Sequence, residues 1–244
     1  MAALLAALLA TGCTATTSGK VVPAPNLALR PLTGSTIKQV LLDGAALSKL
    51  TNQPFQTVPP FPPVFGGSEK LRDDFESAAS ADCGGVVYML QKSAYQSAGV
   101  GNVADEFWRP DDSSAEMSAV HEGIVSLPAA ADASALFARF SAQWKQCDSN
   151  ALTEPSHLFV RDTITDVRVM DSVVAATVSL EPGPGSILAA VPEARAVGVA
   201  GNCLVEVEVA FVGITYPSDQ GSAEISTTAI KIAHALMDKV RALS

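Results

Sequence analysis

The chain has 244 residues and a formal net charge of -9, with 48% hydrophobic and 17% charged residues. This balance is that of a globular protein with enough apolar material for a core, and the length suits one large domain or two small ones. The negative charge argues against a nucleic-acid partner and against unaided adhesion to anionic lipid, because both need basic patches.

An apolar run at the N-terminus closes on Leu9-Ala10-Thr11-Gly12-Cys13. An apolar stretch followed by small residues and a cysteine is typical of a bacterial lipoprotein signal, which is cut before the cysteine. We therefore expect residues 1–13 to be a signal segment and Cys13 to carry acyl chains such as palmitate. The run lacks the Lys or Arg with which export signals begin, so the true start is expected further upstream. The alternative is an N-terminal helix with a chance cysteine.

If the signal is read correctly, the protein is exported and lipid-anchored to the outer face of the cell membrane. Residues 14–35 are rich in Thr, Ser, Gly and Pro, which predicts a flexible tether. A folded domain is predicted over 36–244. It opens with apolar residues at helical spacing from about Thr36 to Leu47. The five prolines from Pro54 to Pro63 predict an extended loop.

Further elements follow in chain order. Helices are predicted at about 69–81 and 84–96, and a strand with one buried face at 117–127. Asp132 is expected to cap a helix to Cys147. Strands are predicted at 159–164, 166–170, 173–180 and 203–214, and a last helix at 223–243. Strands joined by short turns, with helices mostly before and after them, indicate an α+β fold with an antiparallel sheet.

Two aspects of these elements could serve function. Phe137, Phe140 and Trp144 could line a ligand cleft, but their helical spacing favours core packing. In the strand 203–214 the valines alternate with Glu206 and Glu208. The glutamates are predicted to form a solvated strand face, with binding of a cation or a basic partner as the alternative.

Motifs of known enzymes are incomplete in this sequence. Ser35-Thr36-Ile37-Lys38 fits the S-x-x-K of penicillin-binding enzymes and Ser218-Asp219-Gln220 vaguely resembles their second motif, but the K-T-G element is missing. His121-Glu122 begins like a zinc-protease motif. On a strand, however, these two adjacent side chains point to opposite faces, so they cannot easily share one metal ion. We therefore predict no catalytic residue, no metal site and no cofactor.

Three cysteines remain after Cys13: Cys83, Cys147 and Cys203. In an oxidising exported setting two would pair and one would be left over.

Several short motifs occur in an order that is more informative than any of them alone. They are Asp82-Cys83-Gly84-Gly85, Tyr95-Gln96-Ser97-Ala98-Gly99, the passage Val120 to Leu127 with Pro128 and Ala135-Leu136-Phe137, Gln143-Trp144-Lys145-Gln146-Cys147, and Gly201-Asn202-Cys203. Over about Leu41 to Leu243 the sequence resembles the PknH-like extracellular (sensor) domain family, which includes free-standing exported lipoproteins.

The resemblance implies an antiparallel sheet packed with helices around a cleft, in a single domain. Such domains typically carry two disulfides, and Cys83 and Cys147 match one pair. Cys203 matches half of the second, but its partner is expected near Phe159 to Asp162, where there is no cysteine. The resemblance thus implies one disulfide and a free core thiol at Cys203. It covers only the sensor part of a receptor kinase, so no phosphoryl transfer is expected.

Three functions stay open at this point. The first is a non-catalytic module that binds an unknown small ligand or envelope protein in its cleft and contacts the membrane through its lipid anchor only. The second is an envelope hydrolase, for which a nucleophile within reach of His121 or His157 would be evidence. The third is a structural or interaction protein of the envelope, which would need no pocket.

Overall fold

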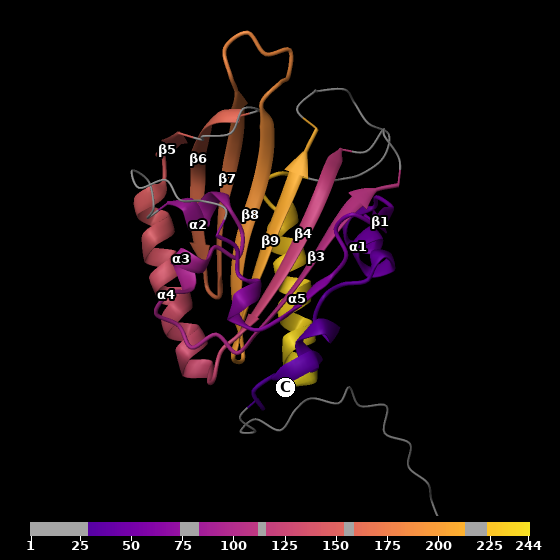
Figure 1. Cartoon of the computed structure of the whole chain (residues 1–244), viewed down its shortest axis with the longest axis vertical. Coiled ribbons are helices and arrows are strands. Elements are labelled where there is room, and N and C mark those ends of the chain that lie inside the picture. The colour runs from indigo at the N-terminus through magenta and orange to yellow at the C-terminus, as the bar shows by residue number, and fades with distance from the viewer. Residues whose placement is uncertain (1–28, 74–82, 112–115, 154–158, 213–223) are drawn as a thin grey trace, which may run out of the picture.

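The computed structural model describes residues 29–73, 83–111, 116–153, 159–212 and 224–244, and its centre is one antiparallel sheet (Figure 1). The strand order is β1-β3-β4-β9-β8-β7-β6-β5, and β2 also pairs with β3. The strands are β1 (Phe55–Thr57), β2 (Val64–Gly66), β3 (Asn102–Pro110), β4 (Met117–Ser126), β5 (Ala151–Thr153), β6 (Phe159–Met170), β7 (Val173–Pro182), β8 (Val191–Ala200) and β9 (Cys203–Phe211).

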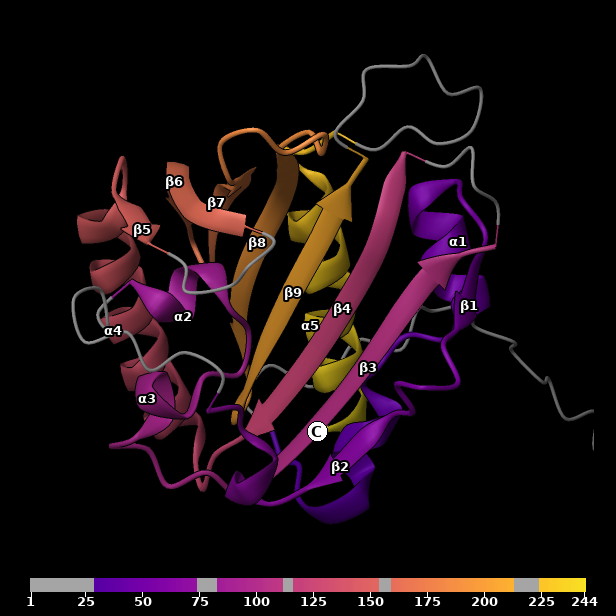
Figure 2. The same ribbon diagram turned by 45° about the horizontal axis from the view of Figure 1, so that its top comes forward.

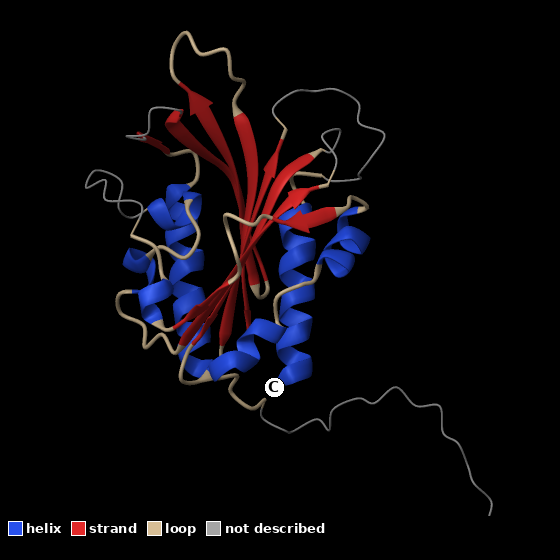
Figure 3. Ribbon diagram, turned by 45° about the vertical axis from the view of Figure 1, so that its right-hand side comes forward, coloured by secondary structure: helices blue, strands red, loops and turns tan. Residues whose placement is uncertain are grey.

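Helices cover both faces of this sheet, which gives three layers (Figure 3). They are the 3-10 turns η1 (Gly34–Gln39) and η2 (Ser68–Lys70) and the α-helices α1 (Gly44–Thr51), α2 (Gly84–Val87), α3 (Lys92–Tyr95), α4 (Ala130–Cys147) and α5 (Thr228–Leu243). The core accordingly has two parts. One lies between the sheet and α5, η1 and α1, and the other between the sheet and α2, α3 and α4.

Tight turns set the register of the later strands. Asp171 and Ser172 join β6 to β7, as the sequence predicts, and Asp171 adopts a positive φ of 44°. Gly201 and Asn202 join β8 to β9, with Gly201 at a φ of 52°. Both turns are two residues long, the length that suits antiparallel neighbours.

On one face α5 packs through apolar residues spaced three and four apart, which include Ile232, Leu236 and Val240. These meet the small and β-branched side chains of β8 and β9. The helix comes closest at Gly198, where an added Cβ would lie 2.5 Å from the sulfur of Met237. The absence of a side chain there therefore lets the helix lie close to the sheet.

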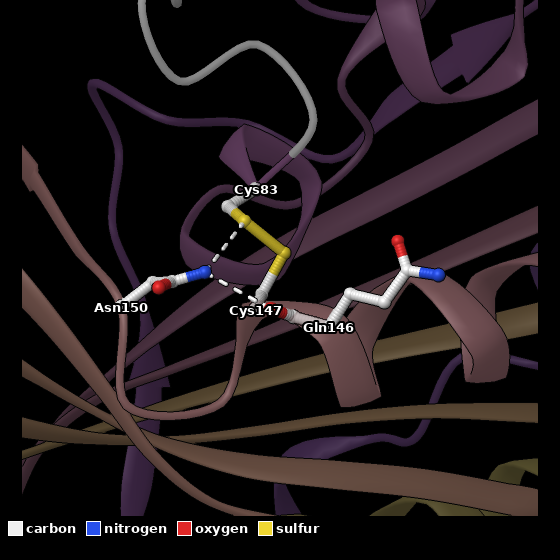
Figure 4. The surroundings of a disulfide bond; sticks show 4 residues. All are labelled: Cys83, Gln146, Cys147 and Asn150. Atoms are coloured by element: carbon white, nitrogen blue, oxygen red, sulfur yellow. Dashed lines mark hydrogen bonds between the residues drawn. A yellow bond between two sulfur atoms is a disulfide. The ribbon is translucent and has the colours of Figure 1, made fainter.

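On the other face α4 buries Phe137, Phe140 and Trp144 against the sheet, so these aromatic residues belong to the core. The disulfide joins Cys83, just before α2, to Cys147 at the end of α4, and Asn150 donates a hydrogen bond to the carbonyl of Gln146 beside it (Figure 4). This is the pair that the family resemblance implies. Cys203 is a buried free thiol.

The N-terminal part of the described chain is bound to the sheet by side chains from other elements. Asn202 accepts a hydrogen bond from the amide of Leu32 at 2.7 Å and donates to the carbonyls of Leu32 and Leu127. Lys239 of α5 donates to the carbonyl of Leu41. Leu32 is 3% exposed, so packing begins before residue 36, where the sequence places the end of the tether.

The sequence prediction differs from the structure in several helices. The expected helix 36–47 is interrupted at Val40–Asp43, and 84–96 divides into α2 and α3 around Leu90, which has a positive φ of 56°. Only η2 lies at the start of the expected helix 69–81, most of which falls outside the described residues. Asp132 is inside the first turn of α4, where its carboxylate accepts a hydrogen bond from the amide of Ala129.

The strands show larger differences. The expected strands 159–164 and 166–170 form one strand, β6, with an irregularity between Thr165 and Arg168. Strands β3 and β8 were not predicted. Both bury residues on both of their faces, so they lack the alternation of polar and apolar residues that identifies a half-buried strand.

No helix among the described residues is long and apolar enough to cross a membrane.

Candidate functional site

The centre of the candidate site is a polar triad of Arg72, Asp105 and His121. Nη2 of Arg72 lies 2.9 Å from Oδ2 of Asp105 and 2.9 Å from Nε2 of His121. Nε2 of His121 also contacts Oδ1 of Asp105. Burial alone would raise the pKa of Asp105, but the hydrogen bond and charge of His121, together with Arg72, hold it below its ordinary value. The carboxylate is therefore ionised, and it fixes both of its partners.

Three separate parts of the chain position this triad. Asp105 and His121 belong to the neighbouring strands β3 and β4, where Asp105 lies opposite Gly123 and Phe107 opposite His121. Arg72 comes from the segment after η2. Its main chain is bound to the loop before α3, because its amide donates to the carbonyl of Leu90 and its carbonyl accepts from the amide of Lys92. The guanidinium is thus held over the sheet from the side of α2 and α3.

A row of rings extends from the triad to the edge of the sheet. The ring centroids of His121 and Phe107 are 5.6 Å apart, as are those of Phe107 and Phe61, and both pairs meet edge to face. Phe61 lies in the proline-rich loop between β1 and β2, and its side chain is 55% exposed. The guanidinium of Arg109 lies 5.8 Å from the ring centroid of Phe107. The row presents an apolar surface that is open to solvent at Phe61.

These groups line a half-open cleft of about 410 Å³. Its walls are the loop 60–64 and Arg72, and strands β3, β4 and β9 supply the remaining lining residues. The complete lining is Pro60, Phe61, Pro62, Val64, Arg72, Asp105, Glu106, Phe107, Arg109, His121 and Glu208. The volume lies within the range of about 300–1,000 Å³ that is usual for small-molecule sites. The cleft lies between the sheet and the proline-rich loop, not between the sheet and the helices.

Figure 2 shows why this part of the sheet is open. The helices α2, α3 and α4 stand over the β5 to β8 side of the sheet, whereas β3 and β4 lie beyond them. The cover ends at the loop before α3, which approaches the sheet at Gly123, where an added Cβ would lie 2.9 Å from Leu90. Beyond Leu90, the described residues that face β3 and β4 across the cleft are Arg72 and those of the loop 60–64.

The prediction that Glu206 and Glu208 form a solvated face is wrong for Glu206, which is 2% exposed. Its carboxylate accepts hydrogen bonds from the hydroxyl of Tyr95 at 2.5 Å and from Arg195 at 3.3 Å. Alternation along β9 does separate the glutamates from the valines, but the glutamate face lies beneath α2 and α3. Glu208 is half-buried and lines the cleft.

Arg195 of β8 is the cation that neutralises this buried carboxylate. It is fully buried, and it donates to the carbonyls of Val86 at 2.9 Å and Val207 at 3.0 Å. It lies opposite Glu208 in the strand register. Burial and then the charge of Glu208 raise the pKa of Glu193, on the same strand, well above its ordinary value. Of these two glutamates, Glu208 is the one that lines the cleft.

His121 and Glu122 point to opposite faces of β4, as the sequence predicts. Glu122 lies on the α5 face, where it is 0% exposed and accepts a hydrogen bond from the amide of Leu42 at 2.9 Å. Burial raises the pKa of Glu122 to about 8. Glu122 therefore takes no part in the cleft, and it helps to hold the segment before α1.

The other candidates from the sequence are not gathered at this site. Ser35 is an exposed residue of η1, and His234 is on the exposed side of α5. Ser218, His157 and Cys13 lie outside the described residues. Within the described part of the chain, no group of three or more His, Cys, Asp and Glu residues is arranged to hold a metal ion.

Sequence reasoning missed Arg72, Asp105, Phe107 and the role of Phe61. Val103, Asp105 and Phe107 are two residues apart from one another, so they share one face of a strand. A charged residue between two apolar ones on the same face was the available signal of a functional position. No local pattern connects Arg72 to them. Arg72 is 33 residues from Asp105 and 49 from His121 along the chain, and only the folded structure brings the three together.

Comparison with known proteins identifies the fold and the family. The extracellular domain of PknH from Mycobacterium tuberculosis has a similar fold, with a TM-score of 0.67 and 20% sequence identity over 87% of this chain and 98% of that one. An uncharacterized protein from Mycobacterium smegmatis, the Rv0999 ortholog, matches with a TM-score of 0.40 and 13% identity over 84% of this chain and 96% of that one.

Among curated proteins none matches the sequence. The family model described as the PknH-like extracellular domain matches residues 32–239, which is most of the chain and includes every residue that lines the cleft. The chain therefore belongs to the PknH-like extracellular domain family.

Proposed function

We propose that this protein is a non-catalytic, sensor-type binding domain of an exported lipoprotein, which holds a ligand in the cleft between the proline-rich loop and strands β3 and β4. The observation that carries the proposal is the cleft itself. It combines an apolar, partly exposed ring row with a fixed polar triad, and a few placed polar groups within a largely apolar lining are typical of binding sites.

The chemistry of the lining favours binding over catalysis. A hydrolase of the serine or cysteine type needs a hydroxyl or thiol within hydrogen-bond reach of its histidine. Among the described residues that line this cleft there is no serine, threonine or cysteine, and Nε2 of His121 is engaged by Asp105 and Arg72. The histidine is thus part of a fixed scaffold.

The anchor belongs to the proposal as well. Membership of an extracellular-domain family fits an exported protein. The apolar run that ends at Cys13 supports acylation of that thiol, with the segment predicted at 14–35, of which Leu32 is already packed on the domain, as the tether to the outer face of the membrane. Replacement of Cys13 by Ala should then abolish acylation and release the protein from membranes, as measured by mass and by partition into detergent.

Native mass spectrometry of the protein extracted from its own envelope tests the binding function. The wild type should carry a non-covalent adduct that is lost from an Arg72→Ala variant with an intact fold. Arg139→Ala is the matched control, because this exposed arginine lies away from the cleft, at a separate hollow beside α4. An adduct that survives Arg72→Ala, or no adduct at all, would contradict binding in this cleft.

Covalent probes for serine and cysteine hydrolases test the enzymatic alternative. The folded protein should not be labelled at a single site. Specific labelling that disappears on mutation of His121 or His157 would favour the hydrolase.

A further inference from the structure

The cleft offers hydrogen-bond donors and acceptors side by side. The guanidinium of Arg72 uses Nη2 for its triad contacts, and the described residues provide no acceptor for its Nε and Nη1 groups. Glu208 lies opposite His121 in the strand register, and its carboxylate has no hydrogen bond or ion pair to any described residue. A ligand in the cleft therefore meets free N–H groups and free carboxylate oxygens flanking the same histidine.

The charged side chains that share the cleft face are balanced. Arg72 and Arg109 contribute two positive charges, and Asp105 and Glu208 contribute two negative ones. Glu106 also borders the cleft, but alternation along β3 places its side chain on the opposite face, where the charge of Lys239 acts on it. An anionic ligand would meet Glu208, and a cationic one would meet both guanidinium groups. Because Asp105 already pairs with Arg72, an added carboxylate gains little there. The balance favours an uncharged ligand.

The apolar part of the cleft is a surface that suits a flat, weakly polar body. Phe61 and Phe107 stand edge to face, and Pro60, Pro62 and Val64 continue the wall. Aromatic rings pack well against the C–H face of a sugar ring, because the face of an aromatic ring is electron-rich, and the prolines extend the apolar wall beside them. A hydroxyl group both donates and accepts, so a polyhydroxylated ring can satisfy Arg72 and Glu208 together.

We propose that the ligand of this cleft is a neutral saccharide, whose C–H face packs on Phe61 and Phe107 and whose hydroxyl or acetamido groups bond to Arg72 and Glu208. This inference rests on the proposed binding function and narrows it to one chemical class. The cleft opens to solvent at Phe61, so it can take a free sugar or one unit of a longer glycan whose remaining units extend outside. Both offer the same hydroxyl groups and C–H face.

Titration of the full chain with defined probes, followed by calorimetry and by amide NMR shifts, tests the inference. The sugars are glucose, N-acetylglucosamine and the β-1,4-linked trimer of N-acetylglucosamine. Leucine is the zwitterionic comparator and octanoate the anionic amphiphile. At least one sugar should bind with millimolar or better affinity and shift the amides of Phe107 and His121. Tighter binding of the trimer would indicate a glycan as the source, and equal binding a free sugar.

Variants then locate the binding. Phe61→Ala removes a side chain that is 55% exposed, so the fold should persist while sugar affinity falls about tenfold. Glu208→Gln keeps the shape of the side chain but makes it a weaker hydrogen-bond acceptor, and a several-fold loss of sugar affinity is expected. Glu181→Gln, an exposed carboxylate outside the cleft, and Arg139→Ala should change nothing.

The inference is overturned if no sugar binds at about 10 mM, if only leucine or octanoate binds, or if sugar affinity is the same in Phe61→Ala and Glu208→Gln. If these occur while the native adduct is still lost from Arg72→Ala, the binding function stands and only the saccharide is refuted. If the adduct is absent too, the binding function itself fails.

Discussion

The two faces of the central sheet come from the same strands but bury different chemistry. Toward α5 the strands present valine, alanine and isoleucine, with Glu122 at the margin. Toward α4 they present Arg195, Glu206, Asp105 and His121 among the apolar residues. The first face is held by packing alone over most of its area. The second depends on charges that pair across neighbouring strands and with distant segments that carry Arg72 and Tyr95, and its open end is the cleft.

The largest difference between the faces should follow from replacing Arg195 by Ala. The change leaves the carboxylate of Glu206 buried without its cation, and such a loss costs between about 3 and 5 kcal/mol. Denaturant unfolding measures it. The double variant Arg195→Met with Glu206→Leu should recover much of the loss, since both charges are then gone. A double variant as unstable as the single one would show that packing around Arg195, not its charge, is what matters.

Reduction of the disulfide should act on the α4 face. The cysteines are 64 residues apart, and closing a loop of this size stabilises the fold by about 4 kcal/mol in the chain-entropy model. The double variant Cys83→Ala with Cys147→Ala should unfold at correspondingly lower denaturant. Hydrogen exchange should increase in α2 and α4 more than in α5. Equal acceleration on both faces would contradict the view that they are separate packing units. Non-reducing peptide mapping checks the pairing of Cys83 with Cys147. A disulfide-linked peptide pair that includes Cys203 would refute it.

On the α5 face, Glu122 should make stability depend on pH. Its pKa is raised from 4.5 to about 8 in the folded protein. The folded state therefore binds this proton more tightly than the unfolded state does. The stability this provides is complete below the unfolded pKa and is lost as pH rises through about 8. From about pH 6 to about pH 9 the wild type should lose about 3 kcal/mol relative to Glu122→Gln. Parallel stability curves for the two proteins would contradict the raised pKa.

The smallest effect is expected at Cys203, on the α5 face. Burial raises the pKa of this thiol to about 12, so almost no thiolate is present at neutral pH. Iodoacetamide should leave the native protein unlabelled and should label one thiol in the unfolded, non-reduced protein. Rapid labelling of the native protein would show that this core opens far more often than its packing suggests.

The two faces also explain which parts of the fold could be predicted from the sequence. The strands β4 and β9, the helices α4 and α5, and the Asp171-Ser172 turn carry regular spacing or turn residues, and they were predicted close to their observed bounds. Family motifs supplied the disulfide. The strands β3, β4, β8 and β9 all bury residues on both faces, but β3 and β8 lack the regular alternation that β4 and β9 show, so their pattern indicates neither a solvated strand nor a core strand.

The prediction of the site was limited because a strand pattern does not show which distant segments cover the strand. His121 was assigned to a strand correctly, but whether it is paired depends on Arg72 and Asp105. Glu206 on β9 was expected in solvent because alternation shows which residues share a face and not what covers that face. The covering residues Tyr95 and Leu90 come from a segment whose helical pattern gave no sign of the bend between α2 and α3.

The contacts of Asn202 have a mechanical consequence. Its side chain joins Leu32 to Leu127, and so the first described residues are fastened to the end of β4 and the turn before β9. Further along the chain Glu122 and Lys239 hold Leu42 and Leu41. A force applied from the N-terminal side would load the hydrogen bonds of Asn202 first. It would then load the bonds that Lys239 of α5 and Glu122 of β4 make to Leu41 and Leu42. Stretching should therefore peel this segment away before it disturbs the sheet, which leaves the cleft intact under modest load.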